Sequence, residues 1–232
     1  MIKIEKINVY GFRAAIRGMR NPMNSWGKSD SCYDENDDFV VGMNDLNLMH
    51  KLYISGTEHR KYLRMIHVSM DVTAPLYWWK EYDTYKIGTT ANSCSTMHKI
   101  TERDLTLDDF SHEHLVKANL EALQDVIDGI NEARHWFLRY DDMLDKDKVN
   151  FDPSIESSKD LWWQMIQMLP TSFNQKRTID LNYENVFTII KQREGHKLDE
   201  WNMFVLYLKN YLPYVNFIMN GGFPKDADDD NK

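Results

Sequence analysis

The segment from Asp71 to Lys99 combines aromatic rings, paired opposite charges and a run of short polar side chains. Its residues 89–96 read TTANSCST, and short hydroxyl and amide side chains hold a small polar ligand at little cost in rotamer entropy. The same composition is typical of a Ser/Thr/Asn-rich loop after a buried helix, and composition alone favours that plain loop. The rings have π-faces that suit a planar heterocycle, or they fill a core. By position, we expect Trp78 and Trp79 to lie in the core or in a subunit interface. We expect Tyr82 and Tyr85 to lie nearer a ligand.

Two carboxylates of this segment, Glu81 and Asp83, are candidates for proton transfer. Lys80 and Lys86 lie close to them in the sequence. Ion pairs with these lysines are therefore an equally good interpretation of the two acids, and exposed pairs of this kind contribute little to stability.

Three arginines occur together near the start of the chain, in FRAAIRGMR: Arg13, Arg17 and Arg20. The stretch is predicted to be helical as far as Asn21-Pro22, where proline ends the pattern. Three neighbouring cations can form an anion subsite, or they can simply cover a solvated helix face. The pattern favours the solvated face.

The residues that commonly bind metals do not form a recognisable set. Cys32 and Cys94 have no CxxC partner and no histidine at ligand spacing, so we expect two reduced thiols. His112, His114 and His135 share no carboxylate-histidine spacing, so we assign no metal.

Other classes of function are disfavoured by the sequence as a whole. None of the motifs GxGxxG, GxxxxGK[ST] and GxSxG occurs. The net charge of -8 argues against a nucleic-acid partner, because binding to phosphates needs a cationic surface. No apolar run approaches the roughly 20 residues of a membrane span, and the N-terminus alternates like a strand. We expect no membrane partner and a cytoplasmic location.

The spacing of apolar residues predicts an α+β fold in which long helices cover a small, mainly antiparallel sheet. Alternation with a period of two predicts strands over residues 3–9 and 63–72. Helical spacing predicts a long tract over 104–143, with Ser111 as its N-cap, and shorter helices over 44–55, 160–169, 181–193 and 196–212.

Three further expectations concern boundaries and domains. Asn44 is the candidate N-cap of the helix over residues 44–55. The acidic stretch 30–38 is expected to be a mobile loop. Residues 1–225 are expected to form one domain, followed by a disordered acidic tail over residues 226–232.

Three blocks of the chain carry a resemblance to a known family. The first begins at His59 and reads HRKYLRMIHVSMDVTAPLYWWKEYDTYKIGTTANSCSTMHK. The second is Leu169-Pro170 and then LNYENVFTIIKQR, and the third is GHKLDEWNMFVLYLKNYLPYV. In this order, the blocks resemble the flavin-dependent thymidylate synthases, the ThyX family. The first resembles the family's histidine-led segment, its Ala-Pro strand and its Arg-His-Arg signature with the following Ser-containing loop, and the third is similar to the closing helix that starts His-Ala-Gln-x-Glu.

The resemblance implies a ThyX-like fold and a reductive methylation of dUMP to dTMP. FAD would be the cofactor, methylenetetrahydrofolate the carbon donor and NADPH the reductant, in a homotetramer. The implied flavin contacts are His59, Arg64, Tyr85, Asn182, Glu184, Thr188, Arg193 and His196. The implied nucleotide contacts are Lys86, Asn92, Ser95 and Arg193, with Ser95 and Lys86 in catalytic roles.

The chain departs from the family at its charged positions. Lys86 takes the place of the signature's last arginine, and Thr84 and Tyr85 replace its Arg and His. Arg64 lies where the family has glutamate and Glu184 where it has arginine. If these two face one another, their attraction survives the exchange; if the register is shifted, both are surface charges. The two interpretations carry equal weight.

These departures leave two alternatives to a thymidylate synthase. A lysine is a point charge and does not reproduce the bidentate fork of an arginine. The chain is therefore also interpreted as a related enzyme acting on another nucleotide or folate. The second alternative is a catalytically inactive homologue that serves as a nucleotide-binding or structural oligomer.

Overall fold

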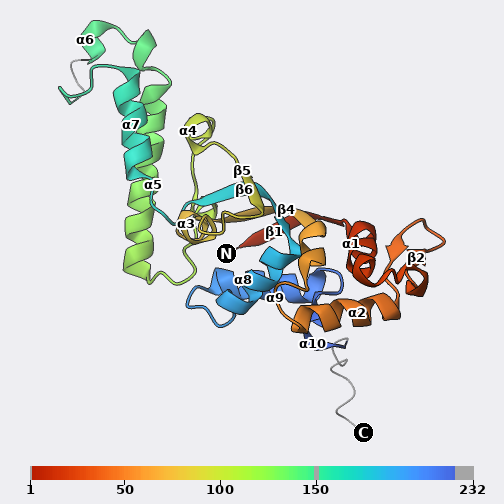
Figure 1. Ribbon diagram of the computed structural model, residues 1–232. Coiled ribbons are helices and arrows are strands. Elements are labelled where there is room, and N and C mark those ends of the chain that lie inside the picture. Colours follow the sequence, from red (N-terminus) through yellow and green to blue (C-terminus); the bar gives the residue numbers. More distant parts are fainter. Residues whose placement is uncertain (1, 149–151, 223–232) are drawn as a thin grey trace. The chain divides into compact units, whose positions relative to one another are not determined.

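The computed structural model describes residues 2–148 and 152–222 (Figure 1). They divide into two compact units. Unit 1 comprises Met1–Lys3, Val72–Asp83 and Asn92–Arg177, and unit 2 comprises Ile4–Asp71, Thr84–Ala91 and Thr178–Lys232. The single domain over residues 1–225 stays a prediction, and the expected acidic tail over 226–232 lies outside the described residues.

Unit 2 contains the beginning and the end of the chain's regular structure. Its first elements are β1 (Lys3–Tyr10), α1 (Phe12–Arg20), the 3-10 turns η1 (Asn21–Met23) and η2 (Trp26–Lys28), β2 (Cys32–Tyr33), β3 (Phe39–Val40), α2 (Met43–Ile54) and η3 (Lys61–Met65). Its last elements are α8 (Tyr183–Arg193), α9 (Asp199–Tyr211) and α10 (Val215–Asn220).

Unit 1 contains the central part of the chain. Its elements are α3 (Leu76–Tyr82), α4 (Thr96–Lys99), η4 (Leu107–Asp109), α5 (Lys117–Phe137), η5 (Tyr140–Asp142), α6 (Asp145–Lys148) and α7 (Ser158–Met168). Strands β4 (His67–Pro75), β5 (Thr89–Ser93) and β6 (Asn174–Asn182) each include residues of both units. The four-stranded sheet has the order β1-β4-β6-β5.

Strand β4 shows why the alternating pattern predicted a core strand. Side chains at every second position of a strand point to the same face. Val68, Met70, Val72 and Ala74 are all buried, whereas the residues between them are half-exposed. The predicted strand is confirmed from residue 67 onward, but residues 61–65 form the 3-10 turn η3 instead.

The two long helices of unit 1 lie side by side and share a core (Figure 1). Leu123, Ile127 and Ile130 of α5 are buried in one apolar cluster with Met165 of α7. Burial of each such side chain stabilises the fold by about 1.5–3 kcal/mol. The apolar spacing of the long tract therefore predicted its packing face correctly. In the part of the chain that the structure describes, no helix is long and apolar enough to span a membrane.

Helix starts were predicted less well than helix cores. Helix α2 begins after Gly42, not at Asn44, and Asp30 accepts hydrogen bonds from the backbone N–H groups of Asn44 at 2.8 Å and Asp45 at 3.2 Å. Helix α5 begins after Val116, so Ser111 is not its N-cap. Both helices lack a capping side chain of their own, and for α2 an acid distant in sequence supplies the acceptors.

Several expected loops contain strands. Within the acidic stretch 30–38, Cys32 and Tyr33 form β2 and pair in antiparallel register with Val40 and Phe39, while residues 34–38 are the loop of this hairpin. Residues 89–93 of the expected polar loop form β5. Strand β6 was not predicted at all, because only Ile179 and Leu181 of its alternate positions are buried apolar residues. Most of its residues are polar, so its local pattern is weak.

The three arginines of α1 do not share one solvated face. Arg13 and Arg17 are exposed, but Arg20 is only 4% exposed, and its Nε lies 2.6 Å from Asp45 Oδ1. Ser29 and Ser31 donate hydrogen bonds of 2.6 Å to the other carboxylate oxygen. The expectation of a solvated face is wrong for Arg20, which forms a buried and fully hydrogen-bonded ion pair.

Candidate functional site

Most of the predicted site residues belong to unit 2. Only Asn92 and Ser95 belong to unit 1, and each unit is described by itself below. The predicted residues of unit 2 are His59, Arg64, Tyr85, Lys86, Asn182, Glu184, Thr188, Arg193 and His196.

Tyr85 and Arg193 form the centre of the arrangement in unit 2. Arg193 Nε donates a hydrogen bond of 2.9 Å to the Tyr85 hydroxyl, which donates to Gln192 Oε1 at 3.0 Å. The guanidinium carbon lies 4.5 Å from the centroid of the Trp201 ring and 5.5 Å from that of Tyr85. A cation between two ring faces is attracted by both quadrupoles. Residues 85 and 193, which come from two different family-like blocks, are thus in direct contact.

His196 extends this arrangement towards α9. Its Nε2 lies 3.2 Å from Nη1 of Arg193, and its Nδ1 lies 3.1 Å from the backbone nitrogen of Leu198. Both neighbours are donors, and a neutral imidazole has one acceptor nitrogen. A neutral His196 therefore accepts from one of them at a time, so its tautomer determines which contact is a hydrogen bond.

The first turn of α8 holds the segment after Tyr85. Asn182 is the N-cap, and its Oδ1 accepts a hydrogen bond of 3.1 Å from the backbone N–H of Asn185. Nδ2 of Asn185 in turn donates to the carbonyl of Ile87 at 2.8 Å. Gly88 has φ +73, and a Cβ there would lie 2.6 Å from Asn182 Nδ2. Glycine is required because both the left-handed backbone and the close approach exclude a side chain.

Glu184 pairs with Arg60 and not with Arg64, so of the two interpretations weighed above the one that pairs Arg64 with Glu184 is wrong. Glu184 Oε1 accepts from Nε of Arg60 at 3.0 Å and from Nη2 at 2.7 Å. Arg64 is exposed, because the 3-10 turn η3 buries Tyr62 and Leu63 and leaves Arg64 on its outer face. The arginine that pairs with Glu184 therefore lies four residues before the one that the resemblance suggested.

Two acceptors in the first turn of α8 have no donor among the described residues. Glu184 Oε2 and Asn185 Oδ1 are both shielded from solvent and accept no hydrogen bond. An unsatisfied buried acceptor costs about 1–3 kcal/mol. A bound water or an N–H group of a ligand would supply the missing donors. Thr188 does not, since its hydroxyl donates to the backbone carbonyl of Glu184 at 2.8 Å.

His59 lines a cavity of about 520 Å³ in unit 2. Other walls of the cavity come from α1 and η3, including Gly18, Lys61 and Met65. A cavity of this size can hold much of a small ligand.

Among the described residues, the exposed cations Arg64 and Lys86 form no hydrogen bond or ion pair through their side chains.

Asn92 and Ser95 are exposed residues of unit 1, in β5 and immediately before α4. Their neighbours Cys94 and Thr96 line a cavity of about 510 Å³, together with Lys99. Cys94 is a free thiol, as is Cys32. The two predicted nucleotide contacts therefore flank a cavity within unit 1.

The expected core position is correct for Trp78 and Trp79, the expected ligand position of Tyr82 is wrong, and that of Tyr85 stays a prediction. Trp78 and Trp79 are completely buried, and Tyr82 is only 1% exposed, with its ring stacked on Trp78 at 5.3 Å. The prediction that Tyr82 lies nearer a ligand is wrong, because positions 78 and 82 are one helical turn apart and share the buried face of α3. Tyr85 comes after the helix and is half-exposed.

Asp83 has a different partner from the predicted lysines. Arg177 Nη1 lies 2.8 Å from Asp83 Oδ1, and the Arg177 guanidinium carbon lies 4.3 Å from the centroid of a Trp79 ring. Strand β6, which the sequence did not predict, carries this arginine. Asp83 is therefore an ion-pair residue and not a free carboxylate for proton transfer.

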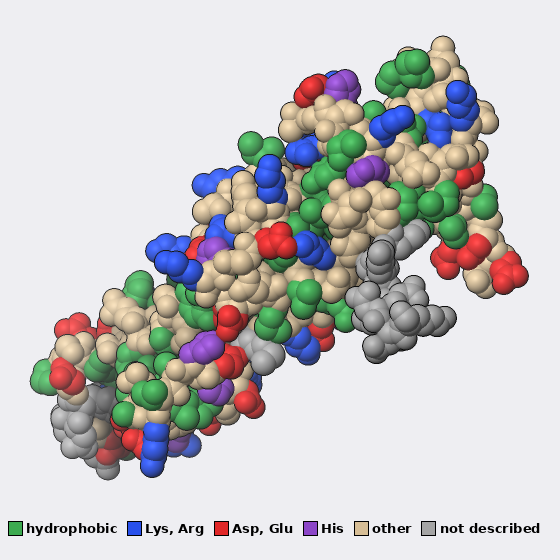
Figure 2. All heavy atoms as spheres, turned by 90° about the horizontal axis from the view of Figure 1, so that it is seen from below, with side chains coloured by type: hydrophobic (Ala, Val, Ile, Leu, Met, Phe, Trp, Pro, Cys, Tyr) green, Lys and Arg blue, Asp and Glu red, His purple; other side chains and the backbone are tan. Residues whose placement is uncertain are grey.

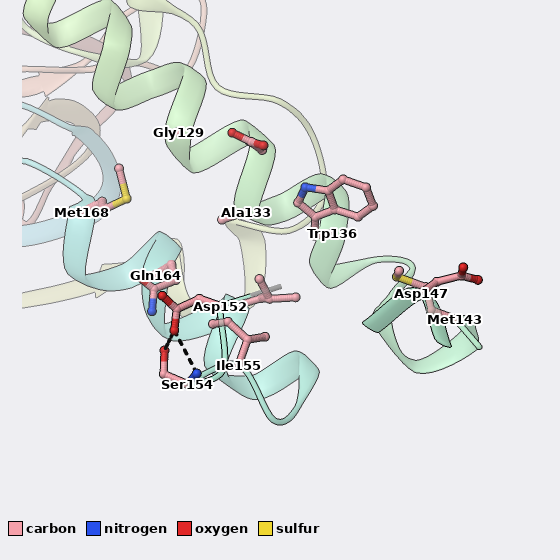
Figure 3. A pocket seen from close by; sticks show the side chains of 12 residues that line it. Gly129, Ala133, Trp136, Met143, Asp147, Asp152, Ser154, Ile155, Gln164 and Met168 are labelled. Carbon is pink, nitrogen blue, oxygen red and sulfur yellow. Dashed lines mark hydrogen bonds between the residues drawn. The ribbon is translucent and has the colours of Figure 1, made fainter. Parts of the chain in front are cut away.

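Another cavity lies in unit 1, beside α5 and α7, and has a volume of about 730 Å³ (Figure 3). Trp136 and Met168 border it, and Asp152 Oδ1 accepts hydrogen bonds from Ser154 N at 2.9 Å and Oγ at 2.6 Å. No predicted site residue lines this cavity, so it is not part of the candidate site. In the described ranges, no group of three or more His, Cys, Asp or Glu residues is placed to hold a metal.

Solved structures share this fold across nearly the whole chain. Thymidylate synthase X (ThyX) from Helicobacter pylori, with FAD and dUMP, matches with a TM-score of 0.61 and 13% identity, over 95% of this chain and 98% of that one. Another flavin-dependent ThyX structure from Helicobacter pylori, with the same two ligands, matches with a TM-score of 0.59 and 15% identity, over 91% and 94%. The chain has a ThyX-like fold. The predicted α+β class, with its small antiparallel sheet, is confirmed.

A UMP/dUMP methylase, PolB from Streptomyces cacaoi, bound with 5-Br dUMP, also has this fold. It matches with a TM-score of 0.53 and 13% identity, over 90% of this chain and 88% of that one. No protein-family model and no curated protein sequence matches the chain. At these identities, the likeness establishes the fold.

The contacts of the candidate site include residues that the sequence reasoning did not select: Arg60, Asn185, Gln192 and Trp201. Asn185 had a local signal. It lies three residues after the N-cap Asn182, at the position whose backbone N–H an N-cap side chain commonly bonds. Arg60, Gln192 and Trp201 had none, because their partners lie far away in the sequence or on another helix.

Proposed function

We propose that this chain is a flavoprotein that binds FAD and a pyrimidine nucleotide and methylates dUMP to dTMP. Methylenetetrahydrofolate would be the carbon donor and NADPH the reductant. The hydrogen bond between Tyr85 and Arg193 carries the proposal, because it joins two separate family-like blocks in one cluster. The likeness of fold to ThyX structures that contain FAD and dUMP supports it.

The residues of unit 2 fit the edge of a planar heterocycle. An isoalloxazine ring and a uracil ring both present an N–H donor beside carbonyl oxygens. Glu184 Oε2 and Asn185 Oδ1 are two neighbouring acceptors without donors in the described chain. Gly88 adds no side chain beside Asn185 Oδ1. A flavin or uracil edge would therefore relieve an existing cost as well as form new hydrogen bonds.

The residues fit a phosphate less well. Arg193 is held by Tyr85, His196 and the Trp201 ring, so its orientation is determined by protein contacts. Lys86 and Arg64 are the exposed cations of the predicted set. Lys86 would neutralise a phosphate as a point charge, without the bidentate geometry of an arginine.

The chain's own side chains would have distinct tasks in this reaction. Bound flavin would supply hydride chemistry. Either Glu184 or Asn185 would orient a ring by accepting its single N–H group, and Arg193 would hold Tyr85 against that ring. Lys86 would screen the nucleotide phosphate, and Ser95 would donate a hydrogen bond to the nucleotide. His59 and Arg64 would contact the cofactor, as would Asn182, Thr188 and His196.

A second candidate is a ThyX-like protein that binds a nucleotide other than dUMP or binds it without turnover. The replacement of the Arg-His-Arg signature by Thr84, Tyr85 and Lys86 favours this candidate. It leaves neutral side chains, Thr84 and Tyr85, at two of the three positions where the family has basic ones. By resemblance, the first proposal also includes a homotetramer and a cytoplasmic location. Light scattering of the purified chain tests the oligomeric state.

Binding of flavin provides the first test. We expect the purified chain to bind FAD, seen as quenching of flavin fluorescence, and to release tritium from C5-labelled dUMP. Glu184→Gln would place an amide nitrogen where an acceptor is needed, so we expect FAD affinity to fall about tenfold, or about 1.4 kcal/mol. Glu35→Gln is the matched control, since Glu35 is an exposed acid of the same unit.

Each result separates the candidates. A chain that binds no FAD, before or after reconstitution, contradicts both enzyme interpretations. Binding of FAD and dUMP without tritium release supports a nucleotide-binding homologue. Release of tritium from labelled UMP, but not from dUMP, identifies a different substrate.

A further inference from the structure

A second cavity of unit 2 lies beside the outer face of α1, next to the β2–β3 hairpin. Its volume is about 450 Å³, within the range of small-molecule sites. No residue assigned to the proposed flavin or nucleotide site lines it. The lining residues used below are Arg13, Arg17, Arg20, Trp26, Ser31 and Phe39.

All the charged side chains that line this cavity are arginines. Arg20 is neutralised by Asp45 at 2.6 Å. Within residues 2–148 and 152–222, neither Arg13 nor Arg17 forms an ion pair; Arg13 contacts the Tyr33 hydroxyl at 3.5 Å. Two of the three arginines of this cavity therefore have no carboxylate partner among the residues that the structure describes.

Arg13 and Arg17 are one helical turn apart on α1. Like charges at this spacing destabilise a helix by about 0.2–0.5 kcal/mol. An anion placed between them would remove this repulsion and gain attraction to both guanidinium groups. The spacing of the arginines thus favours a ligand of negative charge.

Aromatic side chains stand beside these cations. Trp26 is 50% exposed, and its Nε1 donates to Asn21 Oδ1 at 2.8 Å, which restricts the ring's orientation. Phe39 and Tyr33 pack edge to face with their centroids 5.3 Å apart. Exposed rings held next to a guanidinium group provide a surface for another flat ring.

Buried contacts anchor the walls of the cavity. Asp45 accepts from Arg20 as well as from Ser29 and Ser31, so one carboxylate joins α1, α2 and the start of the hairpin. Ser31 Oγ also accepts from the backbone N–H of Gly42 at 3.0 Å. A site held in shape before binding loses less entropy when its ligand arrives.

We propose that this cavity, the α1-hairpin site, binds planar aromatic anions, namely a flat ring that carries a carboxylate or a phosphate group. Arg13 and Arg17 bind the anionic group, and Trp26 and Phe39 contact the ring. The site is independent of the proposed flavin chemistry, since it uses none of the same residues.

Three ligands with one ring system test the site by calorimetry on the full chain: 2-naphthoate, 2-naphthyl phosphate and uncharged 2-naphthol. We expect one or both anions to bind at least tenfold more tightly than 2-naphthol. The comparison of the two anions identifies the acid group that the site prefers. One equivalent of FAD, bound at the proposed flavin site, should leave these affinities unchanged, which separates this site from the proposed function.

Matched variants test the assigned residues. Arg17→Gln should weaken anion binding about tenfold and leave 2-naphthol unchanged, while Trp26→Ala should weaken all three ligands. Lys51→Gln removes the same charge from an exposed position of α2 and should have no effect. Equal affinity for 2-naphthol and the anions would overturn the proposal. So would equal losses in Arg17→Gln and Lys51→Gln, because they would indicate general surface charge.

Discussion

Unit 2 contains two arginine-carboxylate pairs that differ in how completely the acid is hydrogen-bonded. Asp45 is fully buried, and both of its oxygens accept hydrogen bonds, from Arg20, Ser29 and Ser31. Glu184 uses one oxygen for Arg60, while the other has no donor in the described chain. The Asp45 pair is therefore a structural contact, whereas the Glu184 pair retains hydrogen-bonding capacity for a ligand.

The environment of Asp45 also affects its ionisation. Burial disfavours the charged carboxylate, but hydrogen bonds from Ser29, Ser31 and Arg20 outweigh this effect and hold the pKa of Asp45 below its ordinary value. The comparison can be tested by breaking each pair in turn.

Removal of the Asp45 carboxylate should have the largest effect on stability. Asp45→Ala leaves the guanidinium of Arg20 buried without its counter-ion, and we expect the free energy of unfolding to fall by about 3–5 kcal/mol. Urea denaturation followed by circular dichroism measures it. Asp125→Ala, at an exposed position of α5, should change stability by less than about 0.5 kcal/mol. A loss in Asp45→Ala as small as in this control would mean that the pair is not structural.

Loss of Arg60 should cost less, because its partner keeps some exposure to solvent. The Arg60 and Glu184 side chains are 20% and 18% exposed. Arg60→Ala removes both donors to Glu184 Oε1, so we expect a loss of about 1–3 kcal/mol in the same assay. Arg64→Ala is the control and should be nearly neutral.

A charge exchange sharpens the same point. The double variant with Arg60→Glu and Glu184→Arg should be more stable than either single variant, because only the double variant keeps opposite charges together. Equal losses in all three would show that the two groups do not interact.

The pH dependence of stability tests the Asp45 pair as well. The pKa of Asp45 is lower in the folded state than in the unfolded state. Asp45 therefore stabilises the fold fully at pH values above the ordinary pKa of aspartate, about 3.9. This stabilisation is lost as the pH falls from there through the lowered pKa of the folded state, by at most about 1.4 kcal/mol per pH unit. Asp45→Asn should remove this part of the acid dependence, measured by urea denaturation at a series of pH values from 5 downwards. An unchanged slope would contradict the assignment.

The smallest effect is expected at Lys86, which is exposed. Lys86→Gln should weaken dUMP binding by about three- to tenfold and change stability by less than about 0.5 kcal/mol. Lys191→Gln, an exposed lysine of α8, is the control for charge. Isothermal titration with dUMP measures both variants, and equal affinities would remove Lys86 from the nucleotide site.

On the face of the molecule that Figure 2 shows, basic side chains are scattered among acidic ones. The overall charge of -8 therefore says little about any one site. The α1-hairpin site, which has arginines as its only charged walls, occurs in a chain with more acids than bases. Local arrangement, more than net charge, determines which ligands are favoured.

Local patterns in the sequence determined a good part of the architecture. The alternation of β4, the apolar stripe of α5 and the proline after α7 depend on neighbours within a few residues, so they could be predicted. Two of the residues that the family-like blocks selected, Tyr85 and Arg193, are in contact in the folded chain.

Only the tertiary structure decided which residues became partners. Strand β6 is polar and forms because its neighbours in the sheet satisfy its backbone, which no local pattern records. Glu184 pairs with Arg60, which lies 124 residues before it, and not with Arg64. Which arginine it pairs with depends on which side of η3 faces it. The burial of Tyr82 and Arg20 likewise depends on packing between distant segments. Periodicity is a local property of the chain, whereas hydrogen-bond partners and buried charges are set by contacts that only the folded chain brings together.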